Sequence, residues 1–295
     1  MKCIKCDEKS TYKDLCKFHF TKYFEKKVKT TIERFNLINK KEKVMVAASG
    51  GKDSMTVLHI LNKLKYNVTA LAIDEGIENY RNNTLALLRN YCEKNKIKLK
   101  VVSYKNWVGH TLDEIIKKTN DRPCSVCGTF RRYLLNQHSS EFDVLVTGHN
   151  QDDEAQAVLM NLTKNNIDAL NRQGPMSGKG NEQKFTKRVK PLYLSSEKEV
   201  MFYSSINKLT IDFNCCPNIG RSFRLRLKRS LNNVEVQDNI NAKEHIVNWF
   251  IEYKKTISKK DSSKVSIKLC SVCGQNTTGN VCKACQYKER LAKCL

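Results

Sequence analysis

The stretch Val44-Met45-Val46-Ala47-Ala48-Ser49-Gly50-Gly51-Lys52-Asp53-Ser54 decides the fold of this chain. Its first five residues are apolar and mostly small or β-branched, as in a strand that is buried on both faces. After the polar turn, apolar residues recur at helical spacing, at Met55, Val57, Leu58 and Leu61. The turn, residues 49–54, therefore joins a strand to a helix, and we call it the glycine loop.

The glycine loop has the composition of a phosphate site. Gly50 and Gly51 let the backbone approach a ligand closely, and the amides at the start of the following helix point outward. Lys52 adds a positive charge where phosphates would sit. The Walker spacing, Gly-x4-Gly-Lys-Ser/Thr, is absent. The sequence therefore predicts a nucleotide site of another kind, and a tight turn without a ligand is the weaker alternative.

Strands and helices alternate through the centre of the sequence. Strands are expected at 44–48, 68–73, 98–103 and 143–147, and helices at 53–64, 79–95, 111–119 and from 152. Such alternation predicts an α/β fold, a doubly wound parallel sheet with helices on both faces. Ligands bind such sheets at the carboxyl ends of the strands.

Polar motifs follow the expected strands where that rule places a ligand site. Asp74 follows the second strand, and Gly148, Asp152 and Asp153 follow the last one. An aspartate in the first turn of a helix serves as an N-cap, a magnesium ligand or a general base. Two adjacent aspartates that face a phosphate loop favour magnesium binding and acid–base work.

Eight ligand-type residues form two sets of short-spaced pairs, one at each end of the chain. A pair with two intervening residues presents both ligand atoms to one ion, and two pairs complete a tetrahedral zinc site. Free thiols at this spacing are the weaker alternative. We expect a structural zinc site in each set, formed by Cys3, Cys6, Cys16 and His19 and by Cys270, Cys273, Cys282 and Cys285.

The composition indicates a polyanionic partner in the cytosol. Lys and Arg number 53 against 30 Asp and Glu, a formal net charge of +23, which favours nucleic acid over a merely solvated basic surface. Arg221, Arg224 and Lys228 share one face of an expected helix and are predicted to contact RNA phosphates. No apolar stretch reaches membrane-spanning length, and the first residues lack a signal-peptide core.

Three further cysteines have no local second pair. Cys124 and Cys127 are separated by two residues, and Cys216 precedes a proline. From spacing alone, the pair fits zinc, a redox dithiol, a persulfide carrier or an iron–sulfur cluster.

Several motifs together resemble a known family. The glycine loop, SGGKDS, resembles the PP-loop of the ATP pyrophosphatase superfamily, whose members cleave ATP between its α and β phosphates and adenylate a substrate oxygen. With GHNQDDEAQ at 148–156, PCSVCG at 123–128, the late Cys-Pro and the terminal zinc pairs, nearly the whole chain resembles the archaeal and eukaryal type of tRNA 2-thiouridine synthetase, the TtuA group.

This resemblance implies an activity and a set of site residues. ATP and magnesium activate the C2 oxygen of a tRNA uridine, and sulfur replaces it. Cys124, Cys127 and Cys216 hold a [4Fe-4S] cluster with one open iron, with Cys215 the alternative third ligand. Catalytic roles fall to these cysteines and to Lys52, Asp152 and Arg131, which stands where relatives often have lysine. The expected ATP contacts are Ala48, Ser49, Gly50, Gly51, Lys52, Asp53, Ser54, Asp74, Gly148, Asp152 and Asp153.

The expected parts of the chain are a zinc module (1–24), a connecting helix (25–40), the catalytic domain (41–220), a basic helical region (221–260) and a second zinc module (261–295). The expected partners are tRNA, a sulfur donor that is a ubiquitin-like thiocarboxylate protein or inorganic sulfide, and a second copy in a homodimer. Alternatives are 2-thiocytidine synthesis by another PP-loop enzyme, persulfide-based thiolation without a cluster, and a non-catalytic zinc-finger RNA-binding protein. The sequence does not discriminate a wobble uridine from one in the T-loop.

Overall fold

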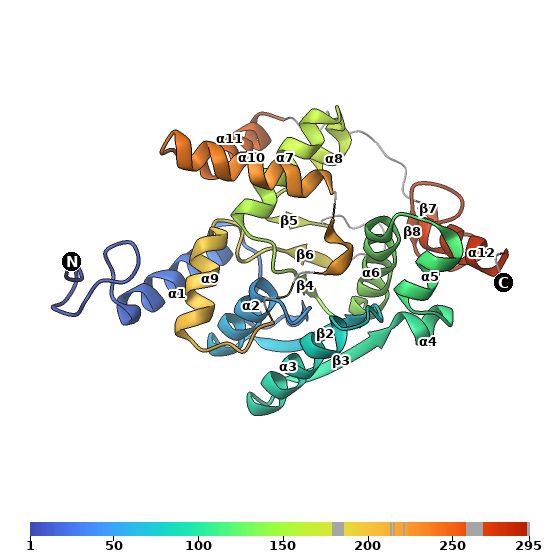
Figure 1. The fold of residues 1–295 in the computed structure, drawn as a ribbon, viewed down its shortest axis with the longest axis horizontal. Coiled ribbons are helices and arrows are strands. Elements are labelled where there is room, and N and C mark those ends of the chain that lie inside the picture. Colours follow the sequence, from blue (N-terminus) through green and yellow to red (C-terminus); the bar gives the residue numbers. More distant parts are fainter. Residues whose placement is uncertain (179–185, 213, 215, 221, 258–267, 294–295) are drawn as a thin grey trace.

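A computed structural model describes residues 1–293 apart from 179–185, 213, 215, 221 and 258–267. Cys215 and Arg221 therefore lie outside the described residues. The centre is a six-stranded sheet in the order β3-β2-β1-β4-β6-β5, parallel except for the β5–β6 pair (Figure 1). Its strands are β1 (Lys43–Ala47), β2 (Asn67–Asp74), β3 (Lys98–Ser103), β4 (Val144–Val146), β5 (Met176–Ser177) and β6 (Lys187–Val189).

Helices surround this sheet, and a small hairpin of β7 (Lys268–Leu269) and β8 (Asn276–Thr277) lies near the C-terminus. The helices are α1 (Lys17–Arg34), α2 (Lys52–Lys63), α3 (Arg81–Lys94), α4 (Tyr104–Val108), α5 (Leu112–Thr119), α6 (Pro123–Ser139), α7 (Gln151–Thr163), α8 (Ile167–Asn171), α9 (Glu197–Ile206), the 3-10 helix η1 (Pro217–Ile219), α10 (Phe223–Gln237), α11 (Ala242–Thr256) and α12 (Lys283–Lys293).

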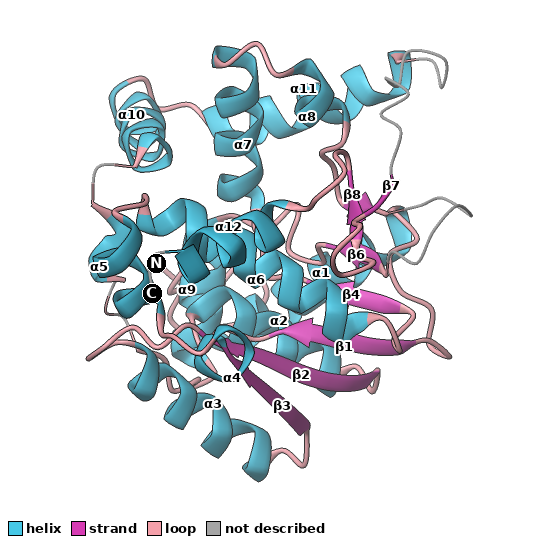
Figure 2. Cartoon of the chain, turned by 90° about the vertical axis from the view of Figure 1, so that its right-hand side faces the viewer, coloured by secondary structure: helices cyan, strands magenta, loops and turns pink. Residues whose placement is uncertain are grey.

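Both faces of the sheet are covered, which confirms the predicted doubly wound α/β fold. Because side chains alternate along a strand, Val44 and Val46 of β1 enter one core and Met45 enters the other. The first core includes residues of α1, α2, α3 and α9, and the second includes residues of α4, α5 and α6. Figure 2 shows the strands between these helix layers.

Four helices form a cap above the sheet. Helices α7, α8, α10 and α11 lie together on the same side of the molecule in Figures 1 and 2. Phe250 of α11 packs on Val158 of α7, and both side chains are buried. The region expected as a separate basic segment is thus in contact with the helix that carries Asp152 and Asp153.

Each terminal module docks on a different helix, and the two chain ends lie at opposite sides of the view in Figure 1. In the N-terminal module, the Tyr12 ring stacks on Phe202 of α9 at 5.0 Å between centroids. In the C-terminal module, Tyr287 meets Phe130 of α6 edge to face at 6.0 Å. The modules therefore contact helices that also border the site described below.

The expected elements between residues 44 and 119 have nearly the bounds that the structure shows. The connecting helix differs, because α1 begins inside the stretch expected as a zinc module and ends at Arg34. Met176–Ser177 form the short strand β5, which was not among the expected strands. Strand β6 was not expected because its Lys187 and Arg188 give no apolar run.

Four helices of the predicted catalytic domain, α4, α6, α8 and α9, were not expected from the sequence. The Cys-x2-Cys stretch opens α6, with Pro123 in its first turn, where a missing amide hydrogen costs nothing.

In the part of the chain that the structure describes, no helix has the length and apolarity needed to cross a membrane.

Candidate functional site

The site lies where three neighbouring parallel strands end. Strands β2, β1 and β4 are adjacent in the sheet, so the segments that follow them meet at one edge. These segments are the glycine loop after β1, residues 74–77 after β2 and residues 147–153 after β4. A cavity of about 500 Å³ lies among them and is lined by residues of all three, including Ser49, Glu75 and Gly148.

The glycine loop has a backbone that only glycine fits at one position. Gly50 has φ +83°, and a Cβ there would lie 2.5 Å from the carbonyl oxygen of Thr84. Ser54 Oγ accepts a hydrogen bond from the amide of Ser49 at 3.1 Å, which closes the loop. Helix α2 begins at Lys52, so its amino-terminal amides and positive dipole end lie at the loop, as expected for an anion site.

The motif after β4 is fixed directly against this loop. A Cβ on Gly148 would lie 2.8 Å from backbone atoms of Asp53 and Ser54. Asn150 caps α7, and its amide group donates a hydrogen bond to Asp53 Oδ1 at 2.9 Å. Gly148 is therefore needed for packing against the glycine loop as well as for its expected contact with ATP.

Lys52 is held by two carboxylates. Its Nζ lies 2.9 Å from Asp53 Oδ2 and 2.9 Å from Glu197 Oε1. Burial alone would lower the pKa of Lys52, but these carboxylates hold it above its ordinary value. Glu197 was missed in the sequence: Ser196-x-x-Glu199 predicts a helix start, but nothing local indicates that Glu197 reaches the glycine loop.

The two aspartates of α7 have different surroundings. Asp152 Oδ1 lies 2.8 Å from Lys243 Nζ, and Asp152 Oδ2 accepts a hydrogen bond from the amide of Glu197 at 2.8 Å. Both oxygens of Asp152 are thus engaged in holding α11 and α9, which does not favour its expected acid–base role. Asp153 lines the main cavity together with Asp53. Burial raises the pKa of Asp53, and the negative charge of Asp153 adds to this increase.

The two acidic residues at the end of β2 line different cavities. Asp74 Oδ1 accepts a hydrogen bond from the amide of Gly76 at 2.9 Å, which turns the carboxylate toward its own loop and a separate cavity. Glu75 lines the main cavity instead. Its Oε2 lies 2.9 Å from Nε of Arg81, a buried residue whose NH1 donates to the carbonyl of Ser49 at 2.6 Å. Arg81, which no local pattern indicated, ties the glycine loop to β2.

The cysteines expected at the site come from two adjacent elements. Cys124 lies in the first turn of α6 and Cys127 in the second, and Cys216 immediately precedes η1. The thiol of Cys124 lies 3.5 Å from the carbonyl oxygen of Asn218, to which it donates. Burial raises the pKa of both Cys127 and Cys216. The next turns of α6 line the main cavity through Gly128, Arg131, Arg132 and Leu135.

The spacing of these three sulfur atoms differs from that of the terminal sets. In each terminal set, all ligand atoms lie within 4.8 Å of one another, and among the described residues the three cysteines form no such group. Zinc–sulfur bonds of ~2.3 Å would draw thiolates to within about 4 Å of each other. The arrangement is therefore wider than a preformed zinc site.

Two further cavity residues carry titratable rings or charges. Arg131 NH1 lies 3.9 Å from Glu75 Oε1, and about half of its side chain is exposed. His149 Nδ1 lies 2.9 Å from Thr147 Oγ1. Desolvation of the ring disfavours its charged imidazolium form and lowers the pKa of His149 to about 4. A neutral ring at the cavity is available to hydrogen-bond a base or a sugar.

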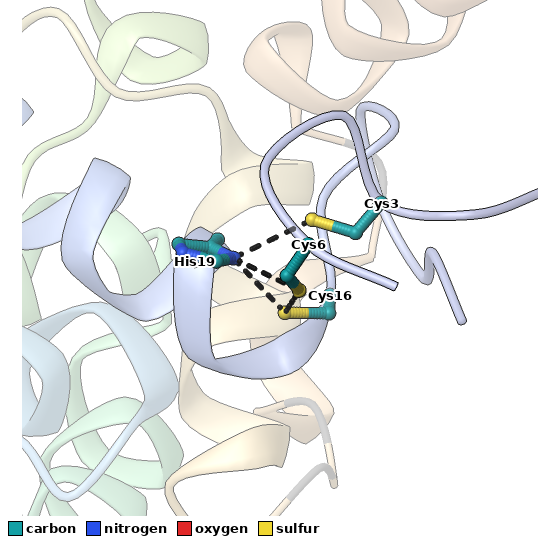
Figure 3. A group of neighbouring side chains, drawn as sticks. All are labelled: Cys3, Cys6, Cys16 and His19. Carbon is teal, nitrogen blue, oxygen red and sulfur yellow. Dashed lines mark hydrogen bonds between the residues drawn. The ribbon is translucent and has the colours of Figure 1, made fainter. Parts of the chain in front are cut away.

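The N-terminal set has the geometry of one tetrahedral site (Figure 3). Nδ1 of His19 lies 3.5, 3.4 and 3.4 Å from the sulfur atoms of Cys3, Cys6 and Cys16. Cys6 and Cys16 have their sulfur atoms 3.7 Å apart. These separations fit four ligands around one zinc ion.

The C-terminal set converges in the same way. Cys273 and Cys282 have their sulfur atoms 3.7 Å apart. Burial would raise the pKa of the Cys270 thiol. Backbone amides that donate hydrogen bonds to its sulfur, including the amide of Cys282 at 3.2 Å, lower this pKa to about 6. A thiol that ionises readily is a good metal ligand.

Known proteins resemble this chain over nearly its full length. A family described as the PP-loop domain matches residues 20–234. The tRNA-5-methyluridine(54) 2-sulfurtransferase of Pyrococcus horikoshii is 35% identical and aligns over 97% of this chain and 93% of its own. Cytoplasmic tRNA 2-thiolation protein 1 of Saccharomyces cerevisiae is 33% identical, over 95% of this chain and 81% of its own.

A solved structure has the same fold throughout. The U34-tRNA thiolase NcsA from Methanococcus maripaludis, determined with its [4Fe-4S] cluster, superposes with a TM-score of 0.82 at 33% identity. The match covers 99% of this chain and 96% of that one.

Proposed function

The chain belongs to the PP-loop domain family, and within it to the tRNA 2-sulfurtransferases, and from this premise we propose that it is an ATP-dependent tRNA thiolase. The product is 2-thiouridine. One observation carries the proposal: the glycine loop, the 147–153 segment and α6, whose first two turns hold two of the three cysteines, border a single cavity. Gly128, which lines this cavity, follows Cys127 directly in the sequence, so the cysteines that we propose to deliver sulfur lie beside the loop that we propose to hold ATP.

Activation of the base is the first half of the reaction. The C2 oxygen of uracil attacks the α-phosphate of ATP, and the bond from that phosphorus to the bridging oxygen breaks. Pyrophosphate takes the bonding electron pair, and N3 of the base loses its proton. Lys52 and the amides at the start of α2 stabilise the charge on the phosphates.

Replacement of the oxygen is the second half. A hydrosulfide attacks C2, AMP leaves with the electron pair of the C2–O bond, and the hydrosulfide proton passes to N3. The sulfur comes from a donor that we propose to be a ubiquitin-like thiocarboxylate protein or inorganic sulfide. The reacting base has to leave its stack to enter the cavity, so a loop nucleotide is the natural substrate.

We propose Asp53 and Asp153 as the magnesium ligands. Both carboxylates line the cavity beside the glycine loop, and they are close enough for Asp153 to raise the pKa of Asp53. Carboxylate oxygens together with substrate phosphates are the ligands that magnesium prefers. A magnesium ion there would neutralise phosphate charge while the α-phosphate is transferred.

We propose Cys124, Cys127 and Cys216 as the ligands of a [4Fe-4S] cluster. Three thiols from two adjacent elements, spaced too widely for a preformed zinc site, fit this larger group. When bound, the cluster supplies a place of attachment for the incoming sulfur. The alternative, a persulfide on one of these cysteines, is distinguished by the iron and sulfide content of protein purified without oxygen.

The remaining partners follow from charge and from the terminal modules. We propose one zinc ion in each terminal set and tRNA phosphates as the main contacts of the basic surface, which belongs to a chain of formal net charge +23. On the family resemblance, we also propose a homodimer, which the molar mass in solution tests. A cytoplasmic location agrees with the name of the yeast relative.

The decisive experiment is an anaerobic thiolation assay. Protein purified without oxygen is incubated with ATP, magnesium, sulfide and unmodified tRNA, and nucleosides and oligonucleotides are analysed by mass. We expect 2-thiouridine, and the oligonucleotides locate it at position 34 or 54. The Lys52→Met variant is expected to lose activity by about 10²–10³-fold, the size typical of one lost transition-state donor. A cluster-loaded, folded protein that forms no 2-thiouridine would overturn the proposal.

A further inference from the structure

The basic face of α10 is directed toward the site. Arg224 and Lys228 were expected to contact RNA, but Lys228 Nζ lies 2.7 Å from Glu197 Oε2, and NH2 of Arg224 donates to the carbonyl oxygen of Asp153 at 3.3 Å. The side chain of Lys228 is 35% exposed and that of Arg224 is 41% exposed. These cations are therefore close to the residues that surround the glycine loop.

A single carboxylate joins α10 to the glycine loop. Glu197 Oε1 lies 2.9 Å from Lys52 Nζ, while its Oε2 lies 2.7 Å from Lys228 Nζ. Burial would raise the pKa of Glu197, but the two ammonium groups hold it below its ordinary value. The position between Lys52 and Lys228 thus favours an anion.

A second cavity contains this position. It has a volume of about 270 Å³ and is lined by Lys52, Arg224 and Lys228. Asp53, Asp153 and Arg224 line both this cavity and the main one. The two cavities therefore adjoin beside the start of α2.

We propose that Arg224 and Lys228, together with Lys52, bind the pyrophosphate that leaves during adenylation. The inference rests on the proposed function, because pyrophosphate arises only if ATP is cleaved between its α and β phosphates. The leaving group departs with the electron pair of the broken bond, and cations nearby stabilise that charge. The polyphosphate competes with Glu197 for the two ammonium groups.

The charges of this second cavity suit pyrophosphate with magnesium. Three cations, Lys52, Arg224 and Lys228, face four carboxylates, Asp53, Asp152, Asp153 and Glu197, so the lining is negative by one formal charge. A magnesium ion at the aspartates makes the total positive, as a polyphosphate requires. Bare RNA phosphates arriving without the ion would meet four carboxylates.

The test measures binding of magnesium pyrophosphate by calorimetry and binding of unmodified tRNA by filter retention, on the full chain. In Lys228→Met, the dissociation constant for pyrophosphate is expected to rise by about tenfold or more, the size of one lost charge-assisted bond. The affinity for tRNA and its salt dependence are expected to stay as in the unmodified chain. Arg229→Met is the matched control, because Arg229 lies on the same helix but is exposed.

A second variant is expected to change the affinity for pyrophosphate in the opposite direction. Glu197→Gln keeps the shape of the side chain but removes the anion that competes for Lys52 and Lys228, so pyrophosphate is expected to bind several-fold more tightly. Equal loss of pyrophosphate affinity in Lys228→Met and Arg229→Met would overturn the inference.

Weaker tRNA binding would also overturn it if the salt slope in Lys228→Met fell by about one unit and pyrophosphate binding were unchanged, because α10 would then contact RNA. If the unmodified chain bound neither ATP nor pyrophosphate, the proposed function itself would fail. Titrations of the unmodified chain alone reveal this outcome, before any variant is compared.

Discussion

The ammonium group of Lys243 lies 2.8 Å from Oδ1 of Asp152, and both side chains are only 7% exposed. Lys243 also lies 2.9 Å from Glu235 Oε2, so it joins α11, α10 and α7 at one point. Asp152 is adjacent in sequence to Asp153, which lines the main cavity. The pair therefore connects the packing of the helical cap to the position of the site.

Replacing Lys243 tests this connection. Lys243→Met leaves a buried carboxylate without its cation, and we expect the free energy of unfolding to fall by about 3 kcal/mol, measured by denaturant titration. The control is Lys255→Met on the same helix. Lys255 pairs with Glu252, both are about two-thirds exposed, and such pairs contribute at most about 1 kcal/mol. Equal losses in the two variants would contradict a special role for Lys243.

The docking of the N-terminal module is predicted to depend on pH through Glu199. Its side chain is fully buried and lies 2.8 Å from Lys27 Nζ and 2.7 Å from Lys13 Nζ. Burial would raise the pKa of Glu199, but Lys27 and Lys13 lower it from 4.5 to about 2. Because the folded pKa is the lower one, the stabilisation is complete above pH 4.5 and is lost as the pH falls toward 2.

The matching variant is Glu199→Gln. The unmodified chain should exceed it in stability by about 3 kcal/mol at pH 7, and this difference should shrink between pH 4.5 and 2. Taking the difference removes effects shared by both proteins, such as protonation of zinc ligands. Glu33→Gln, which alters an exposed pair with Lys29, is the control. A difference that stays constant with pH would contradict the prediction.

The cluster ligands are tested by single substitutions. Cys124→Ala, Cys127→Ala and Cys216→Ala should each lose the brown absorbance and the bound iron of anaerobically purified protein, because three thiolates are needed to hold the cluster. Cys92→Ala is the control, since Cys92 is buried in the core that includes α2 and α3. A cluster that survives in Cys216→Ala but is lost in Cys215→Ala would assign the third ligand to Cys215.

The terminal sets are tested by metal content. Cys273→Ser is expected to retain one zinc ion per chain where the unmodified protein has two, measured by elemental mass spectrometry, because a tetrahedral site needs all four ligands. Hydrogen exchange should then rise in α12, which includes Cys285. Cys92→Ser should keep both ions. Two ions in Cys273→Ser would contradict the assignment of the C-terminal set.

The elements that the sequence predicted are those with local signals. The apolar run before Ser49, the glycines of the loop and the two-residue spacing of the terminal cysteines each concern neighbours in the chain. Steric limits on the backbone and the geometry of metal ligands act at that range. For this reason β1, the start of α2 and the two ligand sets lie where they were expected.

The tertiary structure decided which distant side chains meet these elements. Glu197 lies against Lys52, Lys243 lies against Asp152, and Arg224 and Lys228 of α10 line a cavity beside the glycine loop. Each of these contacts joins segments far apart in the chain, and a charged residue on a helix has the same local pattern whether it faces solvent or a buried partner. By itself the sequence determined the α/β sheet, the glycine loop and the ligand sets, whereas packing between helices decided which charged side chains surround the loop.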